Sequence, residues 1–296
     1  MYELIQAGEN TFYMDCPAKV GFFRTDENHV VMIDSGSDKD AAKKAGKILD
    51  AQGWTLTAIY NTHSHADHIG GNQYLQNKTG CRIFAPETEH SFTVNTILEP
   101  VMLYGSFALE ELKNKFLMAK ESAAEILHEG DLPEGMSLIS LPGHSYNMVG
   151  FRTADDVVFL ADSLASVATT EKYKIGFLYD VEAFINTLEY IKTLEAKCFV
   201  PAHAEAAADI KELAQYNIDK TLEICKTIKG YLETPLCFEE LLAKIFSGYE
   251  LSMNLQQRVL VGSTVKAYLA YLKNKGQLDY SFENNMMLWK CRQETE

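Results

Sequence analysis

The chain has 296 residues, of which 27 are Lys or Arg and 41 are Asp or Glu, so its formal net charge is -14. A hydrophobic content of 47% with 23% charged residues is typical of a globular protein and disfavours disordered, collagen-like and coiled-coil classes. The acidic balance disfavours a protein that holds nucleic acid through its phosphates. A chain of this length is expected to form one large or two ordinary domains with a sizeable core.

The sequence carries no sign of membrane insertion or export. No apolar run reaches the roughly 18 residues that a membrane helix needs, and the first ten residues lack the basic and apolar regions of a secretory signal. The six cysteines contain no C-x-x-C pair, which is typical of free thiols in a reducing compartment. We therefore expect a cytoplasmic protein without a membrane partner.

Strands and helices alternate in the first third of the chain. Short β-branched or aromatic runs broken by turn residues predict strands, and a stretch rich in helix formers that closes at Gly53 predicts the first helix. The expected elements are strands at 11–16, 19–24, 29–33, 56–60 and 82–85, and helices at 38–51 and 72–79.

Residues 86–122 interrupt this alternation. The segment predicts two helical stretches around a Gly-Ser break at 105 and 106, with apolar residues crowded near that break. Two interpretations stay open: a helical insert that packs against the core, or a lid over a pocket.

Strand patterns resume at 125 and continue through SLISLPGHS, MVGFRTA and VVFLADS, with Asp155 and Asp156 supplying a hairpin turn. A helix at 181–195, a strand that ends in CFVPAH and a long helical stretch at about 206–232 follow.

Residues 233–296 predict a small C-terminal domain. Helices are expected at 238–247 and 255–275, followed by a hairpin, which is the outline of a winged helix. One apolar stripe is expected on the longer helix, from Val261, Val265, Leu269 and Leu272. Residues 220–296 hold 10 Lys or Arg and 9 Asp or Glu, so the acidic excess lies almost entirely in residues 1–219.

Residues 63–68 read His-Ser-His-Ala-Asp-His, a pattern that is rare by chance and typical of metal chelation. His63 and His65 are two residues apart after a predicted strand and project to one side. Asp67 and His68 can bind a second metal nearby. Imidazole and carboxylate ligands without thiolate suit zinc, iron, cobalt or manganese.

One loop cannot complete two coordination spheres, so further ligands are expected at other strand ends. Three residues have this context: His144 after Leu141-Pro142-Gly143, Asp162 at the end of VVFLAD, and His203 at the end of CFVPAH. Each alone is more often structural, but together with the HxHxDH loop they favour metal binding.

The order of these motifs resembles that of metallo-β-lactamase fold hydrolases, and most of all the glyoxalase II-like branch. The resemblance covers about residues 1–210 and includes Asp34, the HxHxDH loop, Pro142-Gly143-His144-Ser145, Ala161-Asp162 and Pro201-Ala202-His203. It implies an α/β protein with a four-layered αβ/βα sandwich, which we expect over residues 1–232 with the helical insert at about 86–122. The winged-helix-like α+β domain that the pattern of the later elements predicts then follows over 233–296.

The resemblance also implies the roles of the site residues. It assigns His63, His65 and His144 to one metal, Asp67, His68 and His203 to a second, and Asp162 to both. Asp34 is implied as a carboxylate that orients the ligands from outside the metal shell. This sequence departs from the family pattern in two places, since Ser-Tyr-Asn-Met follows His144 and Ala161 stands where Gly is common.

The implied chemistry is hydrolysis by a metal-bridging hydroxide, with Asp67 handling the proton. Two divalent metal ions are expected, zinc first, with iron or manganese as alternatives. Tyr173, Lys174, Phe177 and Tyr179 are candidate pocket residues, with loop packing as the alternative interpretation.

Three functions compete. The first is hydrolysis of a small ester, thioester or lactone; the second is a mononuclear iron enzyme that resembles persulfide dioxygenases; the third is a nuclease of the same fold. Lys266 and Lys273 could face a nucleic-acid backbone, but the charge of the chain disfavours that partner. We expect a small-molecule substrate, and a homodimer contact or a pocket wall are alternative uses of the C-terminal domain.

Overall fold

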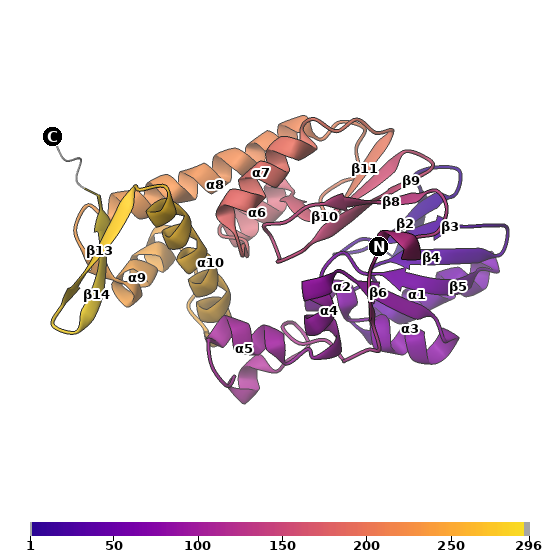
Figure 1. The fold of residues 1–296 in the computed structure, drawn as a ribbon, viewed down its shortest axis with the longest axis horizontal. Coiled ribbons are helices and arrows are strands. Elements are labelled where there is room, and N and C mark those ends of the chain that lie inside the picture. Colours follow the sequence, from indigo (N-terminus) through magenta and orange to yellow (C-terminus); the bar gives the residue numbers. More distant parts are fainter. Residues whose placement is uncertain (1, 293–296) are drawn as a thin grey trace.

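The computed structural model describes residues 2–292 and contains two large β-sheets that face each other (Figure 1). The first sheet has seven strands in chain order, antiparallel from β1 to β4 and parallel from β4 to β7. Its strands are β1 (Glu3–Gln6), β2 (Thr11–Asp15), β3 (Val20–Arg24), β4 (His29–Ile33), β5 (Thr55–Tyr60), β6 (Arg82–Ala85) and β7 (Glu125–Ile126).

The second sheet has four strands in the order β11-β10-β9-β8. These strands are β8 (Met136–Ser140), β9 (Val149–Thr153), β10 (Val157–Ala165) and β11 (Cys198–His203). The β10–β11 pair is parallel and the other pairs are antiparallel. Asp155 and Asp156 form the turn between β9 and β10, and Asp156 adopts the left-handed backbone with φ 64°. The predicted hairpin is therefore confirmed.

Side-chain alternation on the strands creates the layers. Phe22 packs under the helices α1 (Lys39–Gln52) and α3 (Asn72–Thr79), whereas Phe23 packs between the two sheets. The helices α7 (Val181–Ile191) and α8 (Lys211–Tyr231) cover the outer face of the second sheet. The result is helix, sheet, sheet, helix, so the predicted four-layered sandwich is confirmed.

Two helix boundaries can be compared with their predictions. The helix α1 begins after Asp38, whose side chain accepts hydrogen bonds from the first turn, and it ends at Gly53 in the left-handed conformation, as expected. In contrast, α8 begins at Lys211 and not near 206. The reason is that Ala207 exchanges backbone hydrogen bonds with Phe199 of β11, which holds this part of the chain extended.

The insert differs from the prediction in its helices. Both of them, α4 (Glu87–Val94) and α5 (Leu98–Tyr104), precede Gly105, and the segment after Gly105 contains only the 3-10 turn η1 (Glu110–Leu112). Leu112 and Leu117 are buried there without a helix, since they pack against Val259 of the C-terminal helix α10 (Leu255–Asn274), whereas Phe107 and Leu109 beside the break are exposed. The expectation of a second helical stretch after the break is therefore wrong, because contacts with α10, and not a helix, bury Leu112 and Leu117.

Several short elements were not predicted: α2 (Ala66–Ile69), the 3-10 turn η2 (Glu129–Asp131), α6 (Val167–Tyr173) and β12 (Leu236–Cys237). The strand β1 was also missed. All five are short, and their sequence patterns carry no periodic signal of useful length.

The C-terminal region contains two helices and a hairpin, as predicted. The elements are α9 (Phe238–Gly248), α10 (Leu255–Asn274), β13 (Leu278–Glu283) and β14 (Met286–Cys291), and β12 completes a sheet in the order β12-β14-β13. The α10 stripe of Val261, Val265, Leu269 and Leu272 is buried. The division into domains at 233 stays a prediction, and residues 1 and 293–296 of the two predicted domains lie outside the described residues.

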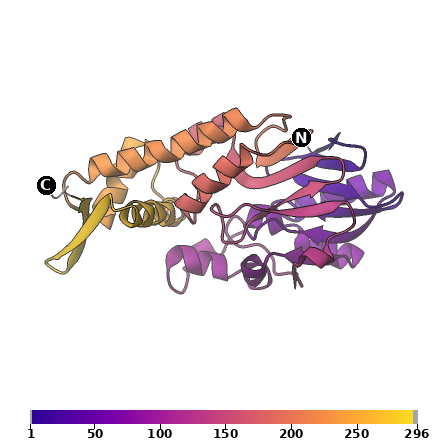
Figure 2. The ribbon, with the colours of Figure 1, turned by 45° about the horizontal axis from the view of Figure 1, so that its top comes forward.

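The helix α8 links the two regions, since it runs from the second sheet to the C-terminal helices in both views (Figures 1 and 2). One hydrophobic cluster includes Leu160 of β10, Ile228 of α8 and Leu269 of α10. The C-terminal helices therefore share a core with the outer helical layer of the sandwich. Within residues 2–292, no helix combines the length and apolar character that crossing a membrane requires.

Candidate metal centre

The HxHxDH loop follows β5, and the short helix α2 begins inside it, at Ala66. Gly70 and Gly71 let this loop approach the segment after β4 closely. A Cβ at Gly70 would lie 2.3 Å from the carbonyl oxygen of Ser37, and one at Gly71 would lie 2.3 Å from that of Ser35. Only glycine fits at both positions, so the Ile-Gly-Gly sequence fixes the loop beside Asp34.

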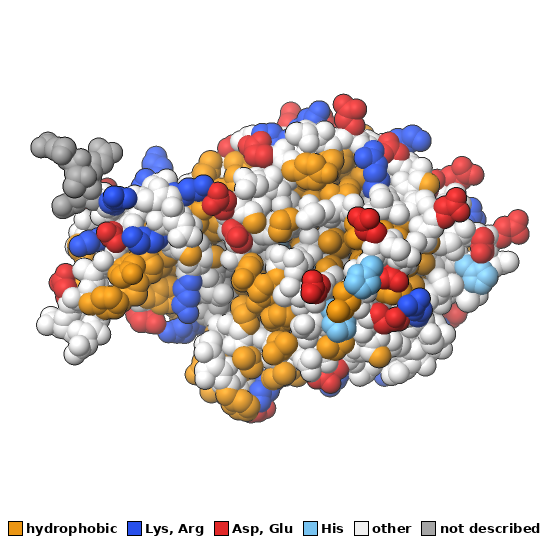
Figure 3. Space-filling model, in the orientation of Figure 1, with side chains coloured by type: hydrophobic (Ala, Val, Ile, Leu, Met, Phe, Trp, Pro, Cys, Tyr) orange, Lys and Arg blue, Asp and Glu red, His pale blue; other side chains and the backbone are white. Residues whose placement is uncertain are grey.

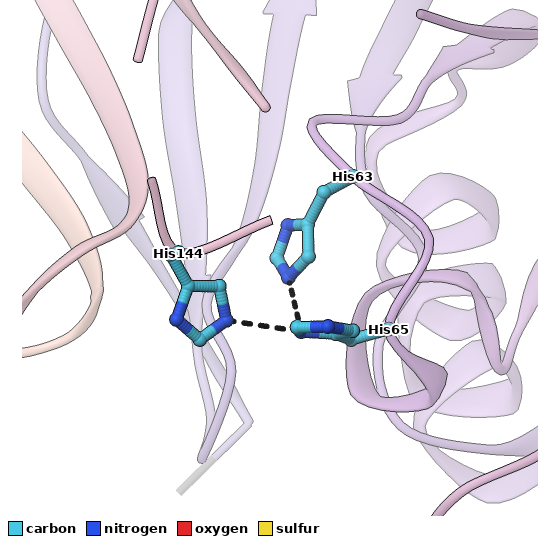
Figure 4. A group of neighbouring side chains, drawn as sticks. All are labelled: His63, His65 and His144. Atoms are coloured by element: carbon cyan, nitrogen blue, oxygen red, sulfur yellow. Dashed lines mark hydrogen bonds between the residues drawn. The ribbon is translucent and has the colours of Figure 1, made fainter. Parts of the chain in front are cut away.

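Three histidines bring one ring nitrogen each to a common point (Figure 4). His63 Nε2 lies 3.0 Å from His65 Nδ1, and His144 Nε2 lies 2.9 Å from the same atom. Nitrogens bound at about 2.0–2.1 Å to a tetrahedral zinc ion lie roughly 3.3–3.4 Å apart, so a small adjustment would accommodate an ion. We call these residues the three-histidine group.

A second group contains Asp67, His68, Asp162 and His203, and we call it the mixed group. His68 Nε2 lies 3.0 Å from Asp162 Oδ1, and His203 Nε2 lies 3.1 Å from Asp162 Oδ2. Asp67 Oδ2 is 3.3 Å from His203 Nε2. All seven predicted ligands therefore lie in two neighbouring groups, although they come from four separate segments of the chain.

Asp162 connects the groups, because its Oδ2 also lies 3.4 Å from His144 Nε2. Asp162 Oδ1 and His68 Nε2 are buried, and neither makes a hydrogen bond in the described structure despite the short distance between them. Buried polar atoms without a hydrogen bond are costly in a folded protein. Their orientation toward shared space, together with the imidazole and carboxylate donors around them, fits a bound divalent metal.

The outer nitrogens of three of these histidines are held by hydrogen bonds. His68 Nδ1 donates to Asp34 Oδ2 at 2.7 Å, and His203 Nδ1 donates to the carbonyl of Pro17 at 2.7 Å. His63 Nδ1 lies 3.0 Å from Thr62 Oγ1, which itself donates to Asp34 Oδ2. Each bond places a proton on Nδ1, so Nε2, which faces the group, is the nitrogen that can bind a metal once it carries no proton.

Asp34 lies where its predicted orienting role requires. It is 3% exposed and also accepts a hydrogen bond from the Thr62 backbone N–H at 2.8 Å. Its φ of 60° is in the left-handed region, which Asp tolerates better than most residues. That conformation turns the carboxylate from the end of β4 toward His68.

The two groups differ in charge. Burial lowers the pKa of His65 and of His144 to about 4. The pKa of His63 is lowered as well, mainly by burial and secondly by the charges of neighbouring histidines. In the mixed group burial again disfavours charge, but Asp162 and Asp67 outweigh it and raise the pKa of His203 to about 10. His68 has a raised pKa for the same reason.

Glu89 was not predicted, although it connects two ligand loops. This residue of α4 is fully buried, and its Oε2 accepts hydrogen bonds from the backbone and hydroxyl of Ser64 at 3.0 and 2.6 Å. Its Oε1 accepts from the Ser145 hydroxyl at 2.6 Å and the Asn147 backbone at 3.1 Å. Nothing in the surrounding sequence distinguishes this Glu from a solvent-exposed helix residue.

A cavity of about 910 Å³ adjoins both groups. Of the four candidate pocket residues, Tyr173, Lys174 and Phe177 line it, whereas Tyr179 does not and contacts the ring of Tyr146 instead. Glu99 of the insert also lines the cavity, with Oε1 3.8 Å from His65 Nε2. Burial, with the charges of Glu89 and Asp67, raises the pKa of Glu99 to about 8. The insert therefore forms part of the cavity wall.

The family model for the metallo-beta-lactamase superfamily matches residues 14–203, which include every residue of both groups. The chain belongs to the metallo-beta-lactamase superfamily. Among curated relatives, it is 33% identical over 150 residues to the hydroxyacylglutathione hydrolase of Nitrobacter hamburgensis, covering 48% of this chain and 50% of that protein. A second such enzyme, from Bradyrhizobium sp. (strain BTAi1), is 33% identical over 130 residues and covers 43% and 42% of the two chains. The chain thus spans about half the length or less of these relatives.

Solved structures of the superfamily share the fold over almost the whole chain. A metallo-beta-lactamase family protein from Thermus thermophilus has a TM-score of 0.71 at 17% identity and covers 96% of this chain and 99% of its own. A beta-lactamase domain protein from Burkholderia ambifaria has a TM-score of 0.74 at 14% identity, with 98% and 94% covered. The likeness therefore extends beyond residue 203 into the C-terminal helices.

Two departures from the superfamily pattern have structural explanations. Ala161 has φ 48°, in the left-handed region where Gly is favoured, at a register shift between β10 and β11. After His144, Ser145 and Asn147 are the residues that bind Glu89. The Ser145 hydroxyl and the Asn147 backbone thus join this loop to the insert, and neither contact uses the Asn147 side chain.

Proposed function

We propose that this protein is a metal-dependent hydrolase of a small ester, thioester or lactone. The observation that carries the proposal is the convergence of seven ligand-type side chains into two groups that share Asp162. In this proposal one metal is held by His63, His65 and His144, and a second by Asp67, His68 and His203. The curated relatives support the thioester option, since their name denotes hydrolysis of an acylated glutathione.

When bound, two divalent metals would supply a water acidic enough to attack at neutral pH and positive charge for the carbonyl oxygen. The residues of the chain have separate tasks. Asp34 keeps His68 oriented through its Nδ1 proton. Asp67 receives the proton of the attacking water, because its side chain is 42% exposed and lines the cavity, whereas Asp162 is 8% exposed.

The reaction consumes one water. The bond between the carbonyl carbon and the ester oxygen or thioester sulfur breaks, giving a carboxylic acid and an alcohol or thiol, or a hydroxy acid from a lactone. No Ser or Cys nucleophile is needed for this balance.

The test is elemental analysis of protein purified without added metal, combined with an esterase and thioesterase assay. We expect about two divalent ions per chain, and loss of activity in His65→Ala. The matched control is His29→Ala, because His29 is exposed and its side chain contacts only the Asp26 carboxylate among the described residues. Full activity in metal-free protein would refute the proposal. Oxygen consumption with a persulfide would instead favour the mononuclear iron alternative.

A further inference from the structure

The cavity beside the two ligand groups reaches from them to the C-terminal helix α10. Asp67, Asp162 and His203 border one part of it, and Val261 and Tyr268 of α10 border another. A substrate whose reacting carbonyl lies at the ligands would therefore place its remaining atoms against α10. The nature of that wall indicates which substrates fit.

The inner wall is apolar. Six of its side chains are only 1–6% exposed and belong to the cluster that joins the second sheet to the C-terminal helices. They are Leu164, Ile175, Leu178, Phe184, Val261 and Tyr268. Polar neighbours in the wall are already bonded, since Asn217 Nδ2 donates to the Ala165 carbonyl at 2.9 Å and Thr221 Oγ1 donates to the Asn217 carbonyl at 2.8 Å.

The charged side chains of the wall do not favour an anionic acyl group. Three of the four lining lysines have a carboxylate partner within 4 Å, and Lys172 contacts the Tyr173 hydroxyl at 3.1 Å. The paired lysines are Lys115 with Asp38, Lys174 with Glu171, and Lys220 with Glu171 and Glu223. Little free positive charge therefore faces the cavity.

The rim of the cavity is apolar like its inner wall. Phe116 of the insert lines the cavity and is 69% exposed. In Figure 3, hydrophobic side chains gather over the insert and the middle of the same face, beside histidine and acidic side chains. Apolar surface therefore extends outward from the cavity onto the insert.

We propose that the acyl part of the substrate is an apolar hydrocarbon chain, which extends from the ligand groups along α10 toward Tyr268. This inference rests on the proposed function and narrows its substrate class. Burying each added methylene in such a wall should raise kcat/KM about fourfold until the cavity is filled.

The test uses the full chain loaded with zinc and a series of p-nitrophenyl esters from acetate to decanoate. Activity that rises steeply with chain length and then levels off is expected, and a flat or falling series would overturn the inference. Binding of decanoate and acetate is measured in parallel by calorimetry. If no ester is hydrolysed, the proposed function fails, and binding still decides the inference: tighter binding of decanoate supports it, and equal binding overturns it.

Variants at Leu260 test where the hydrocarbon chain of the substrate lies. Leu260 lines the cavity from α10 and is partly buried. Leu260→Trp should lower the decanoate-to-acetate ratio of kcat/KM at least tenfold, and Leu260→Ala should move the plateau to longer esters. Leu222→Trp is the matched control, because Leu222 is 45% exposed on α8 and does not line the cavity. Folded Leu260 variants with the wild-type ratio and plateau would contradict the proposal.

Discussion

The three-histidine group and the mixed group lie side by side, but their histidines differ in protonation. Burial keeps His65 and His144 neutral, with pKa values lowered to about 4, so their nitrogens can bind a cation without losing protons. In the mixed group, Asp67 and Asp162 keep His203 protonated, with a pKa raised to about 10. The first group is therefore prepared for a metal at neutral pH, whereas a metal in the second must displace protons.

The difference shows what the fold contributes to each group. The three-histidine group depends on loop geometry, which Glu89 maintains by binding Ser64 and Ser145. The mixed group depends on carboxylate charge and on the bonds of Asp34 and Pro17 to the outer histidine nitrogens. Changes to each set should therefore produce different defects.

The largest effect is expected from Asp162→Ala, because Asp162 contacts both groups. Loss of several kcal/mol of charge stabilisation would lower kcat/KM on the order of a thousandfold or more. Esterase kinetics and metal content check this, with Asp40→Asn as the control because the Asp40 side chain is 81% exposed. Wild-type metal content and activity in Asp162→Ala would show that it does not connect two metals.

Asp34→Asn should affect the mixed group more than the three-histidine group, because Asp34 binds His68 directly and reaches His63 only through Thr62. An amide N–H₂ facing His68 Nδ1 favours the tautomer that protonates Nε2, the atom that faces the metal position. Metal affinity or activity should fall roughly 10- to 100-fold. Zinc titration in competition with a chelator measures this; a defect equal for both ions would contradict this difference.

Glu89→Gln should weaken the connection between the two ligand loops. One carboxylate oxygen that accepts two hydrogen bonds becomes an amide donor, so two buried donors lose their acceptor. We expect a loss of about 1–3 kcal/mol in the free energy of unfolding, together with reduced activity. Urea unfolding of the metal-free protein measures the stability; Glu87→Gln on the exposed part of the same helix is the control.

The two groups should give metal-free protein opposite pH dependences. The lowered pKa values of His65 and His144 mean that the unfolded chain binds more protons, so stability falls as the pH falls from about 6.5 to about 4. The raised pKa of His203 contributes stability below about 6.5 that is lost as the pH rises through about 10. The free energy of unfolding, measured between pH 4 and 10, tests both losses of stability. His203→Gln should reduce the loss of stability at alkaline pH without abolishing it, because His68 also has a raised pKa; an unchanged loss would refute the contribution of His203.

The smallest effect is expected from Ala161→Gly. Ala161 has a left-handed backbone, which costs an L residue roughly 1–2 kcal/mol, but its methyl group is buried. The variant should therefore unfold within about 1 kcal/mol of wild type, with unchanged metal content. A large destabilisation would show that the buried methyl group outweighs the backbone strain.

The sequence predicted the sandwich well because its strands and helices have strong, regular patterns, as in the strand over 29–33 and the helix that closes at Gly53. It failed where packing across the chain decides the structure. The segment after Gly105 packs Leu112 and Leu117 against α10 without forming the expected helix, and the pairing of Ala207 with Phe199 delays the start of α8.

The same distinction applies to the site. The seven candidate ligands were predictable because their residue types and order form a motif, and the structure brings them together. Glu89 was not predictable, because its partners Ser64 and Ser145 lie 25 and 56 residues away. Glu99 and the wall on α10 were missed for the same reason, since only the tertiary fold places them beside the ligands.

The most direct test of the central claim is a calorimetric titration of metal-free protein with zinc, repeated in buffers of different ionisation enthalpy. The proposal of one ion in each group predicts two ions per chain. The ion in the three-histidine group should bind with little proton release, and the ion in the mixed group should displace protons from His68 and His203. A single ion per chain, or two ions that release equal numbers of protons, would contradict the account.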